Sequence, residues 1–223
     1  MISINKVSTP ASLTYFIKAN KNISNNSFES LEANVKADIK ESLLKEQKGL
    51  CAYCMRNIKY NSMRVEHWLP QVQTKGSVLD YSIMLGVCCG EIGDVYCCDN
   101  FRGKTGYGNN GDLKFNPANK AHHQQMKIRY KPSGEIASDD NEFNTQLEKT
   151  LNLNNEYMKF SRKAVYTSVC QALEKSSHGK ELTKTQCNNI LNNWKRCNGQ
   201  GKLPEYCGVA IYVIEKRLAR CKV

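Results

Sequence analysis

The segment GLCAYCMRNIKYNSMRVEHWLP, residues 49–70, decides how this chain folds. Cys51 and Cys54 are separated by two residues, and this spacing lets two thiolates face one zinc ion from a tight turn. A tetrahedral zinc site needs two more ligands, which we expect from the cysteines that follow at positions 88, 89, 97 and 98. The sequence therefore predicts a structural zinc site with four cysteine ligands. The alternative is a redox-active dithiol at Cys51 and Cys54, which would not involve the later cysteines.

Cysteine usage along the rest of the chain agrees with a metal site rather than with disulfides. The start of the chain, MISINKVSTP, has no apolar core of the kind that a secretory signal carries, so we expect a cytoplasmic protein with reduced thiols. Five further cysteines occur singly and are expected to be buried free thiols: Cys170, Cys187, Cys197, Cys207 and Cys221.

Composition places the chain among ordinary globular proteins and excludes a disordered tail, a collagen-like fibre and a coiled coil. Hydrophobic residues make up 40% of its 223 residues and charged residues 24%. There is no run of eighteen apolar residues, so we expect no membrane-spanning helix and no membrane partner. The 32 Lys and Arg residues exceed the 21 Asp and Glu residues by 11, which favours a polyanionic partner, with nucleic acid as the first candidate.

Hydrophobic periodicity predicts helices at both ends of the chain. Residues 1–26 are expected to form a short strand or an irregular arm, followed by an amphipathic helix over 28–47 that Ser27 caps and Gly49 ends. Further helices are predicted over 141–150, 156–175, 183–197 and 205–220, the last starting after Pro204. In the helix over 156–175, Tyr157 and Phe160 are expected on the apolar side.

The middle of the chain has poor periodicity, with extended runs at 63–65 and 113–115 and a turn at 132–134 between two short strands. We expect a mostly helical α+β fold in three parts. An N-terminal arm and helix cover 1–48, a zinc-supported centre covers 49–116, and a hairpin with C-terminal helices covers 117–223.

Two polar motifs lie within the cysteine frame. Glu66 and His67 form an acid–imidazole pair, and an imidazole can take a proton from water near neutral pH while a carboxylate holds a divalent cation. Asp99 directly follows a candidate zinc ligand, Cys98, and would be held in place by it. The alternative is structural, with a surface Glu66, a half-buried His67 and an N-capping Asp99.

Together these motifs resemble those of the CxxC-type HNH endonucleases: Cys51-x2-Cys54, Glu66-His67-x2-Pro70, Asp80-Tyr81 followed by Cys88, and Cys98-Asp99. The resemblance implies a ββα-metal fold, in which a hairpin and one helix clasp a catalytic divalent cation above a structural zinc. It selects Cys88 and Cys98 as the second zinc pair.

The same resemblance assigns roles within the site. His67 is expected to be the general base, and Glu66 and Asp99 are expected to bind Mg²⁺ or Mn²⁺. The chain departs from the pattern at Ile83, where the family has an Asn that orients the His. Ser82 or Asn100 could take over that role, or Ile83 could disable the enzyme.

Later segments are similar to a narrower group, the PtuB nuclease subunits of Septu and retron antiphage systems. The similarity rests on RYKPSGEI at 129–136, LNLNN at 151–155 and the helix start Phe160-Ser161-Arg162. It implies a bacterial defence effector that works with an ABC-type ATPase and, in a retron, with a reverse transcriptase and its RNA/DNA product.

Basic residues near and after the core are candidates for phosphate contacts, which set affinity more than sequence choice. DNA is the favoured substrate and RNA the second. A non-catalytic zinc-knuckle adaptor that binds nucleic acid or a partner is the alternative function, with Ile83 in its favour. The candidate nucleic-acid contacts are Arg102, Lys104, Lys114, Lys127 and Arg129.

Overall fold

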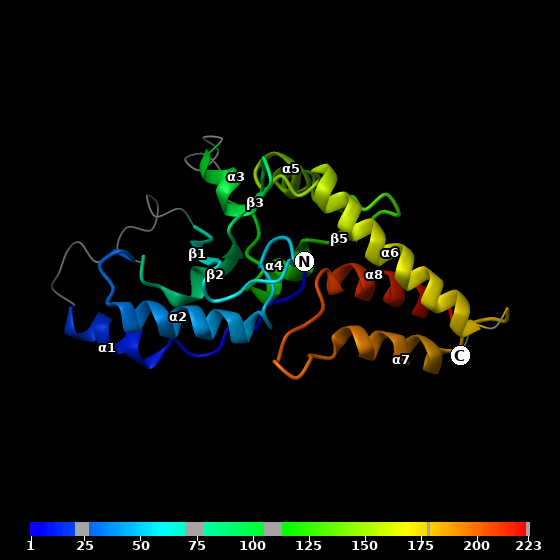
Figure 1. Cartoon of the computed structure of the whole chain (residues 1–223), viewed down its shortest axis with the longest axis horizontal. Coiled ribbons are helices and arrows are strands. Elements are labelled where there is room, and N and C mark those ends of the chain that lie inside the picture. The colour runs from blue at the N-terminus through cyan, green and yellow to red at the C-terminus, as the bar shows by residue number, and fades with distance from the viewer. Residues whose placement is uncertain (21–26, 70–77, 105–112, 178, 222–223) are drawn as a thin grey trace.

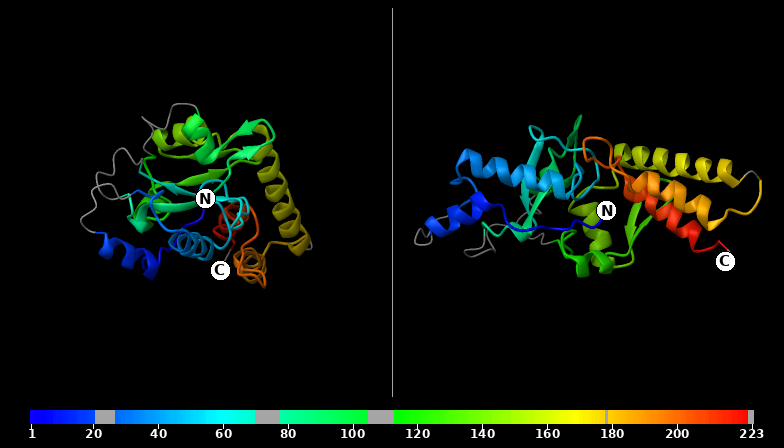
Figure 2. Two further views of the ribbon diagram at one scale, coloured as in Figure 1. Left: turned by 60° about the vertical axis from the view of Figure 1, so that its left-hand side comes forward. Right: turned by 90° about the horizontal axis from the view of Figure 1, so that it is seen from below.

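The computed structural model describes residues 1–20, 27–69, 78–104, 113–177 and 179–221, and they form a mostly helical α+β fold (Figure 1). The molecule is elongated, with α1 and α2 towards one end and a group of C-terminal helices at the other (Figures 1 and 2). The helices are α1 (Ala11–Ala19), α2 (Ala33–Glu46), α3 (Cys98–Lys104), α4 (Lys120–Gln125), α5 (Asn141–Lys149), α6 (Glu156–Ser177), α7 (Lys184–Lys195) and α8 (Cys207–Leu218), with a 3-10 turn, η2, at Tyr81–Ile83.

The strands pair into small two-stranded antiparallel sheets. One sheet joins β1 (Met63–His67) to β2 (Met84–Cys88), another joins β3 (Glu91–Ile92) to β4 (Val95–Tyr96), and another joins β5 (Ile128–Tyr130) to β6 (Ile136–Ser138). The β5–β6 hairpin confirms the predicted turn at 132–134. The predicted extended run at 113–115 is wrong, because these residues form no strand; Leu113 and Phe115 are instead buried in the core.

The N-terminal arm differs from its prediction, because it contains a helix rather than a strand. In α1, Leu13, Phe16 and Ile17 lie three and four positions apart, which places them on one helical face. The next helix, α2, starts at Ala33 rather than at residue 28, and Ser27 does not cap it. Ser27 instead belongs to a preceding turn, in which it accepts hydrogen bonds from Ser30.

The end of α2 is joined to the β1–β2 sheet by one buried amide side chain. Nε2 of Gln47 donates to the carbonyl oxygens of Leu50 and Gly86, at 2.7 and 2.6 Å, and its Oε1 accepts the N–H of Gly86 at 2.7 Å. A Cβ atom at position 86 would lie 2.8 Å from Met63 Cε and 3.2 Å from Gln47 Nε2, so a glycine is needed there. This bridge fixes the sheet relative to the chain that enters the first cysteine turn.

The C-terminal helices α6, α7 and α8 pack around an apolar core of their own. That core consists of buried residues from all three helices and the preceding loops: Val169, Leu173, Leu182, Cys187, Leu191, Ala210, Val213 and Ile214. The four predicted helices from residue 141 onward are confirmed, but Pro204 lies before α8, which starts at Cys207 after a left-handed Tyr206. Within the described ranges, none of the helices is both long and apolar enough to cross a membrane.

The buried face of α6 differs from the one that apolar spacing predicted only towards its N-terminal end, since Val169 and Leu173 further along are buried. Tyr157 and Phe160 are 52% and 75% exposed, whereas Met158 and Arg162 are buried. Nε of Arg162 donates to the Gly134 carbonyl at 2.6 Å, and its Nη2 donates to the Leu153 carbonyl at 2.6 Å. The guanidinium therefore ties the β5–β6 turn and the 151–155 loop to α6.

Candidate metal centre and the polar cluster beside it

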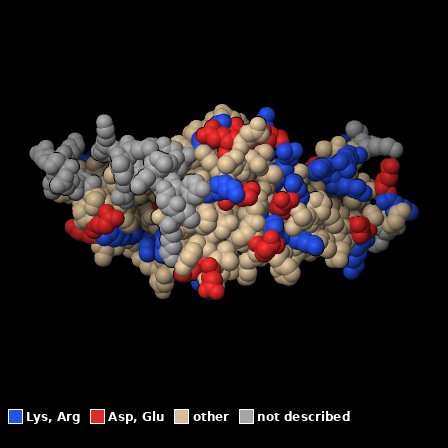
Figure 3. Space-filling model, turned by 90° about the horizontal axis from the view of Figure 1, so that it is seen from above, with Lys and Arg blue, Asp and Glu red and all other residues tan. Residues whose placement is uncertain are grey.

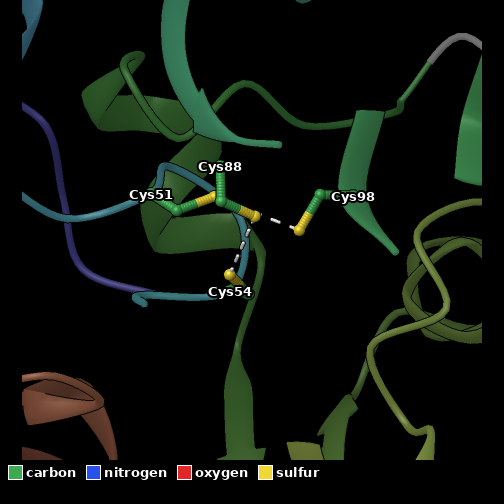
Figure 4. Close-up of side chains that lie close together, drawn as sticks. All are labelled: Cys51, Cys54, Cys88 and Cys98. Carbon is green, nitrogen blue, oxygen red and sulfur yellow. Dashed lines mark hydrogen bonds between the residues drawn. The ribbon is translucent and has the colours of Figure 1, made fainter. Parts of the chain in front are cut away.

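Four buried cysteines bring their sulfur atoms together at the centre of the molecule (Figure 4). All the sulfurs of Cys51, Cys54, Cys88 and Cys98 lie within 4.8 Å of one another. The Cys51–Cys98 distance is 4.0 Å and the Cys54–Cys88 distance is 3.8 Å. Four sulfurs held tetrahedrally at a Zn–S bond length of about 2.3 Å would be separated by about 3.8 Å. The arrangement therefore fits the geometry of a structural zinc site, and these are the four ligands that the sequence indicated.

Separate backbone features place the two halves of this four-cysteine cluster. The first pair sits in a tight turn in which the Cys51 N–H donates to the Arg56 carbonyl at 2.8 Å and the Met55 N–H donates to the Cys51 carbonyl at 3.1 Å. Cys88 is the last residue of β2 and Cys98 the first of α3. Cys98 adopts a left-handed φ of 54°, and its N–H donates to the Leu151 carbonyl at 2.8 Å. The 151–155 loop thus helps to position a metal ligand.

The thiols of the cluster differ in how readily they ionise. Burial raises the pKa of the Cys54 thiol well above its ordinary value, and hydrogen bonding among the sulfurs does the same for Cys98. The pKa of Cys88 is instead lowered, because the neighbouring thiols donate to its sulfur. The protein alone thus favours a thiolate at Cys88 and neutral thiols at Cys54 and Cys98, and a divalent cation would stabilise their ionised forms. The group could therefore hold a structural Zn²⁺.

Cys89 and Cys97, the alternatives within each later pair, lie outside this group of four. The Cys89 thiol is partly exposed and donates weakly to the Glu91 carbonyl at 3.9 Å. Cys97 is buried beside the cluster, and hydrogen bonding to Cys88 raises its pKa to about 12. A neutral thiol is therefore the expected form of Cys97.

A buried ion pair lies next to the cysteines. Nη1 of Arg102, on α3, is 2.7 Å from Oε1 of Glu66, on β1, and both side chains are almost fully buried. The Tyr53 hydroxyl, from the first cysteine turn, donates to the same carboxylate oxygen at 3.4 Å, and Arg102 Nη2 donates to the Trp68 carbonyl at 3.4 Å. The first cysteine turn, β1 and α3 therefore meet at the Glu66 carboxylate.

Asp99 belongs to the same polar cluster. It lies in the first turn of α3, and its Oδ2 is 3.9 Å from Nη1 of the partly exposed Arg64 on β1. Burial raises the pKa of Glu66 well above its ordinary value; the hydrogen bond and negative charge of Asp99 raise it further, and the Arg102 guanidinium opposes them. β1 and α3 therefore bring together Glu66 and Asp99, the two carboxylates predicted as cation ligands. Arg102 pairs with Glu66, and Arg64 lies beside Asp99.

His67 has different neighbours from Glu66. Successive side chains of a strand point to opposite faces, and the ring of His67 contacts Phe28 edge-on, with their centroids 5.9 Å apart. Its Nε2 is 2.8 Å from the Val78 carbonyl oxygen. A carbonyl can only accept, so Nε2 carries the hydrogen and the neutral ring keeps its lone pair on Nδ1. Burial lowers the pKa of this imidazole, which favours the neutral form.

Position 83, where the family resemblance predicts an Asn, holds a buried isoleucine. Only the backbone of this residue can form hydrogen bonds. Ile83 ends η2, its side chain is 8% exposed, and its carbonyl accepts the Trp68 N–H at 2.9 Å. The side-chain amide of Asn100 donates to the Cys89 carbonyl at 3.3 Å rather than to His67. The Val78 carbonyl is therefore the group that orients the His67 ring.

The candidate phosphate contacts are scattered and mostly paired with acids. Arg102 is buried against Glu66, Lys114 pairs with Asp140 and Glu142, and Arg129 pairs with Asp139 at 2.6 Å. Lys127 is exposed, whereas the side chain of Lys104 lies outside the described residues. Figure 3 agrees, because basic and acidic side chains intermingle on the face it shows.

Sequence reasoning missed two members of the polar cluster. Arg102 was expected to reach phosphate, yet it neutralises Glu66; its position three residues after Asp99 on a helix, and so on the same face, was the available signal. Tyr53, inside the CxxC turn, gave no signal. Across the part of the chain that the structure describes, the four-cysteine cluster is the only close group of three or more metal-ligating side chains. No protein-family model matches this chain, and no curated protein is significantly similar to it.

Proposed function

We propose that this protein is a metal-dependent endonuclease of the HNH type, with a ββα-metal core formed by β1, β2 and α3. The observation that carries the proposal is the convergence of Glu66 and Asp99 from a strand and a helix beside the four-cysteine cluster. Cys88 ends β2 and Cys98 begins α3, so zinc at the cluster would hold the strand pair and the helix in fixed relation. Zinc is therefore assigned a structural role.

The residues of the core have separate tasks in this proposal. His67, with Nε2 held by the Val78 carbonyl, accepts a proton from water at Nδ1. Glu66 and Asp99 hold a Mg²⁺ or Mn²⁺ ion, which when bound stabilises the charge that develops on the phosphate. Arg102 pairs with Glu66 and would balance the charge of this carboxylate where no cation is bound.

The substrate and partners follow from the sequence resemblance. The chain carries a net charge of +11, which favours attraction to DNA, with RNA as the second substrate. An ABC-type ATPase would be the partner in an antiphage system of the Septu or retron kind. The exposed aromatic pair Tyr157 and Phe160 on α6 supports a protein partner, because exposed aromatic side chains are typical of interfaces.

A cleavage assay tests the catalytic assignment. Plasmid DNA, single-stranded DNA and RNA are incubated with the purified protein and Mg²⁺ or Mn²⁺, alone and with an ABC-type ATPase of the proposed kind. His67→Ala should lower the cleavage rate by about 10²–10⁴-fold, the usual contribution of a general base. The control residue is Glu32, an exposed carboxylate that precedes the first cysteine turn in the sequence. Glu32→Gln should leave the cleavage rate unchanged. Equal rates for wild type and His67→Ala, at equal zinc content, would refute the nuclease mechanism.

The second candidate is a non-catalytic adaptor, favoured by Ile83 and by the Glu66–Arg102 pair that already neutralises the proposed cation ligand. Comparison of the wild type with Ile83→Asn separates the two functions. A large gain in cleavage with Ile83→Asn identifies a disabled nuclease. An absence of cleavage by either form, with the partner present, together with retained nucleic-acid or partner binding, identifies the adaptor.

A further inference from the structure

We propose that a second site, distinct from the polar cluster at Glu66, binds the phosphate groups of nucleotides or nucleic acid. The site is a cleft of about 640 Å³ between the segment that follows the first cysteine turn and the loop that joins α7 to α8. Hydrogen bonds from the Leu203 N–H to the Lys48 carbonyl and from the Tyr206 N–H to the Met55 carbonyl hold these two segments side by side (Figure 2).

Charge is the first argument for this ligand. Lys59, Arg196 and Lys202 line the cleft, and no Asp or Glu is among its lining residues. None of these three cations takes part in an ion pair within the described ranges, in contrast to Lys114 and Arg129. The acid that follows in sequence, Glu205, is engaged by the N–H of Asn57 at 2.6 Å. The three cations therefore outnumber the neighbouring carboxylate of Glu205, whose hydrogen bond to the lining residue Asn57 leaves its negative charge in place.

The second argument is the order of the loop between α7 and α8, which carries Arg196 and Lys202. The side-chain oxygen of Asn198 accepts the N–H groups of Gln200 and Lys202, at 2.9 and 3.0 Å. The backbone N–H of Asn198 donates to the Lys202 carbonyl at 2.8 Å, and Gly201, with φ of 72°, closes the turn. Lysines on a loop built in this way lose less entropy when they bind a ligand than lysines on an open surface.

The side chain of Lys202 is also fixed along its length. A Cβ atom at Gly49 would lie 2.8 Å from Lys202 Cγ and 3.1 Å from its Cδ, so the lysine stem lies directly over that glycine. Gly49 itself has a φ of 72°, which adds a backbone reason for glycine at this position. The first part of the Lys202 stem is thus packed against the chain that enters the first cysteine turn.

The polar chemistry of the cleft matches phosphate. A guanidinium and two ammonium groups supply charge-assisted donors, and the amide side chains of Asn193, Asn198 and Gln200 line the same space. The volume is within the usual range for small-molecule sites, large enough for a nucleotide or a short stretch of backbone. The proposal does not depend on catalysis at His67.

Fluorescence anisotropy with a labelled 20-nucleotide single strand and a 20-base-pair duplex tests the site in buffer without Mg²⁺, so that no cleavage occurs. The test variant is Lys59→Met, Arg196→Met, Lys202→Met, which keeps the aliphatic stems. The control variant is Lys163→Met, Lys175→Met, Lys180→Met, which removes the same charge from exposed positions elsewhere. Competition with ATP and with inorganic phosphate identifies the source of the phosphate, and unfolding midpoints confirm that all the proteins are folded.

The test variant should bind about tenfold more weakly or worse, and the slope of log K against log salt should become shallower by about two to three units. The control variant should lose no more than about threefold. If the test variant loses only its affinity for ATP, the cleft binds a free nucleotide. If it loses affinity for the oligonucleotides, the cleft binds a nucleic-acid strand. Either result supports the site. Equal losses in the two variants, or no loss of any phosphate ligand in the test variant, would overturn it.

Discussion

The centre with the four-cysteine cluster and the C-terminal helices differ in how their secondary structure is built. The centre, from the first cysteine turn to α3, contains strands of two to five residues and a seven-residue helix. The C-terminal part has helices of 22, 12 and 12 residues that enclose an ordinary apolar core. The centre shares a larger apolar core with α2, but its own strands and helix are short, so we expect its four close cysteines to add stability that the long C-terminal helices do not need.

The cysteines show the same difference. In the centre, four of them form one close group, whereas Cys187 and Cys207 in the C-terminal part are fully buried among apolar side chains. Cys187 and Cys221 approach to 3.7 Å but have no second pair beside them among the described residues. The close group of four cysteines thus lies where the secondary structure is short, whereas Cys187 and Cys207 lie among apolar side chains where the helices are long.

Loss of one zinc ligand should have the largest effect of any single substitution. Cys88→Ser removes a thiolate from the four-cysteine cluster, and we expect loss of bound zinc and loss of about 5 kcal/mol or more of stability, because metal binding and folding are coupled. Zinc analysis and urea unfolding measure both. Cys89→Ser, the neighbouring partly exposed thiol, is the matched control and should change stability by less than about 1 kcal/mol. Equal effects of the two substitutions would refute the choice of ligand.

Arg162 links the two regions, and its replacement should have the next largest effect. Arg162→Met leaves the buried carbonyls of Gly134 and Leu153 without their donor, at a cost of about 4 kcal/mol in the free energy of unfolding. The exposed neighbour Lys163→Met should cost less than about 0.5 kcal/mol. Because the loop that contains Leu153 also bonds Cys98, Arg162→Met should make zinc easier to remove by a chelator. Unchanged zinc release would argue against a link between the two regions.

A core substitution in the C-terminal helices should destabilise them without touching the metal. Ile214→Ala removes a fully buried side chain, and we expect a cost of about 2–3 kcal/mol from lost burial and the cavity left behind. Zinc content and the rate of chelation should stay at their wild-type values. Zinc loss in this variant would show that the two regions depend on each other more than their separate cores indicate.

The smallest expected effect concerns the start of α7. Thr183 forms a capping box with Gln186, in which each side chain bonds the other's backbone N–H. Thr183→Ala should lower stability by about 1 kcal/mol in thermal unfolding. Thr167→Ala, on the exposed face of α6, should have no measurable cost, since alanine favours a helix interior. A larger loss from Thr167→Ala than from Thr183→Ala would contradict the assigned cap.

The sequence predicted the C-terminal helices well, because helical periodicity is a local signal, whereas spacing indicated only that cysteines would gather and the family resemblance selected Cys88 and Cys98. It failed at α1, where Pro10 and several polar residues suggested an arm although Leu13, Phe16 and Ile17 have helical spacing. It also failed at the start of α6, because a buried Arg162 and an exposed Phe160 reverse the usual hydrophobic pattern there. The position of Arg162 depends on partners outside its own helix, at the β5–β6 turn and the 151–155 loop.

The polar cluster could be predicted only in part, because its contacts also depend on partners from other elements of the fold. Adjacency in sequence suggested that Glu66 and His67 act at one point, yet the alternation of a strand gives them different neighbours. The orienting group of His67 is a backbone carbonyl, which leaves no trace in side-chain motifs.

X-ray absorption at the zinc edge of the purified protein tests the central claim most directly, because it measures the ligands of the metal in place. The account predicts one zinc per chain with four sulfur ligands at about 2.3 Å, and loss of that signal in Cys88→Ser but not in Cys89→Ser. Protein that is fully folded without zinc, or zinc bound through nitrogen and oxygen ligands, would contradict it.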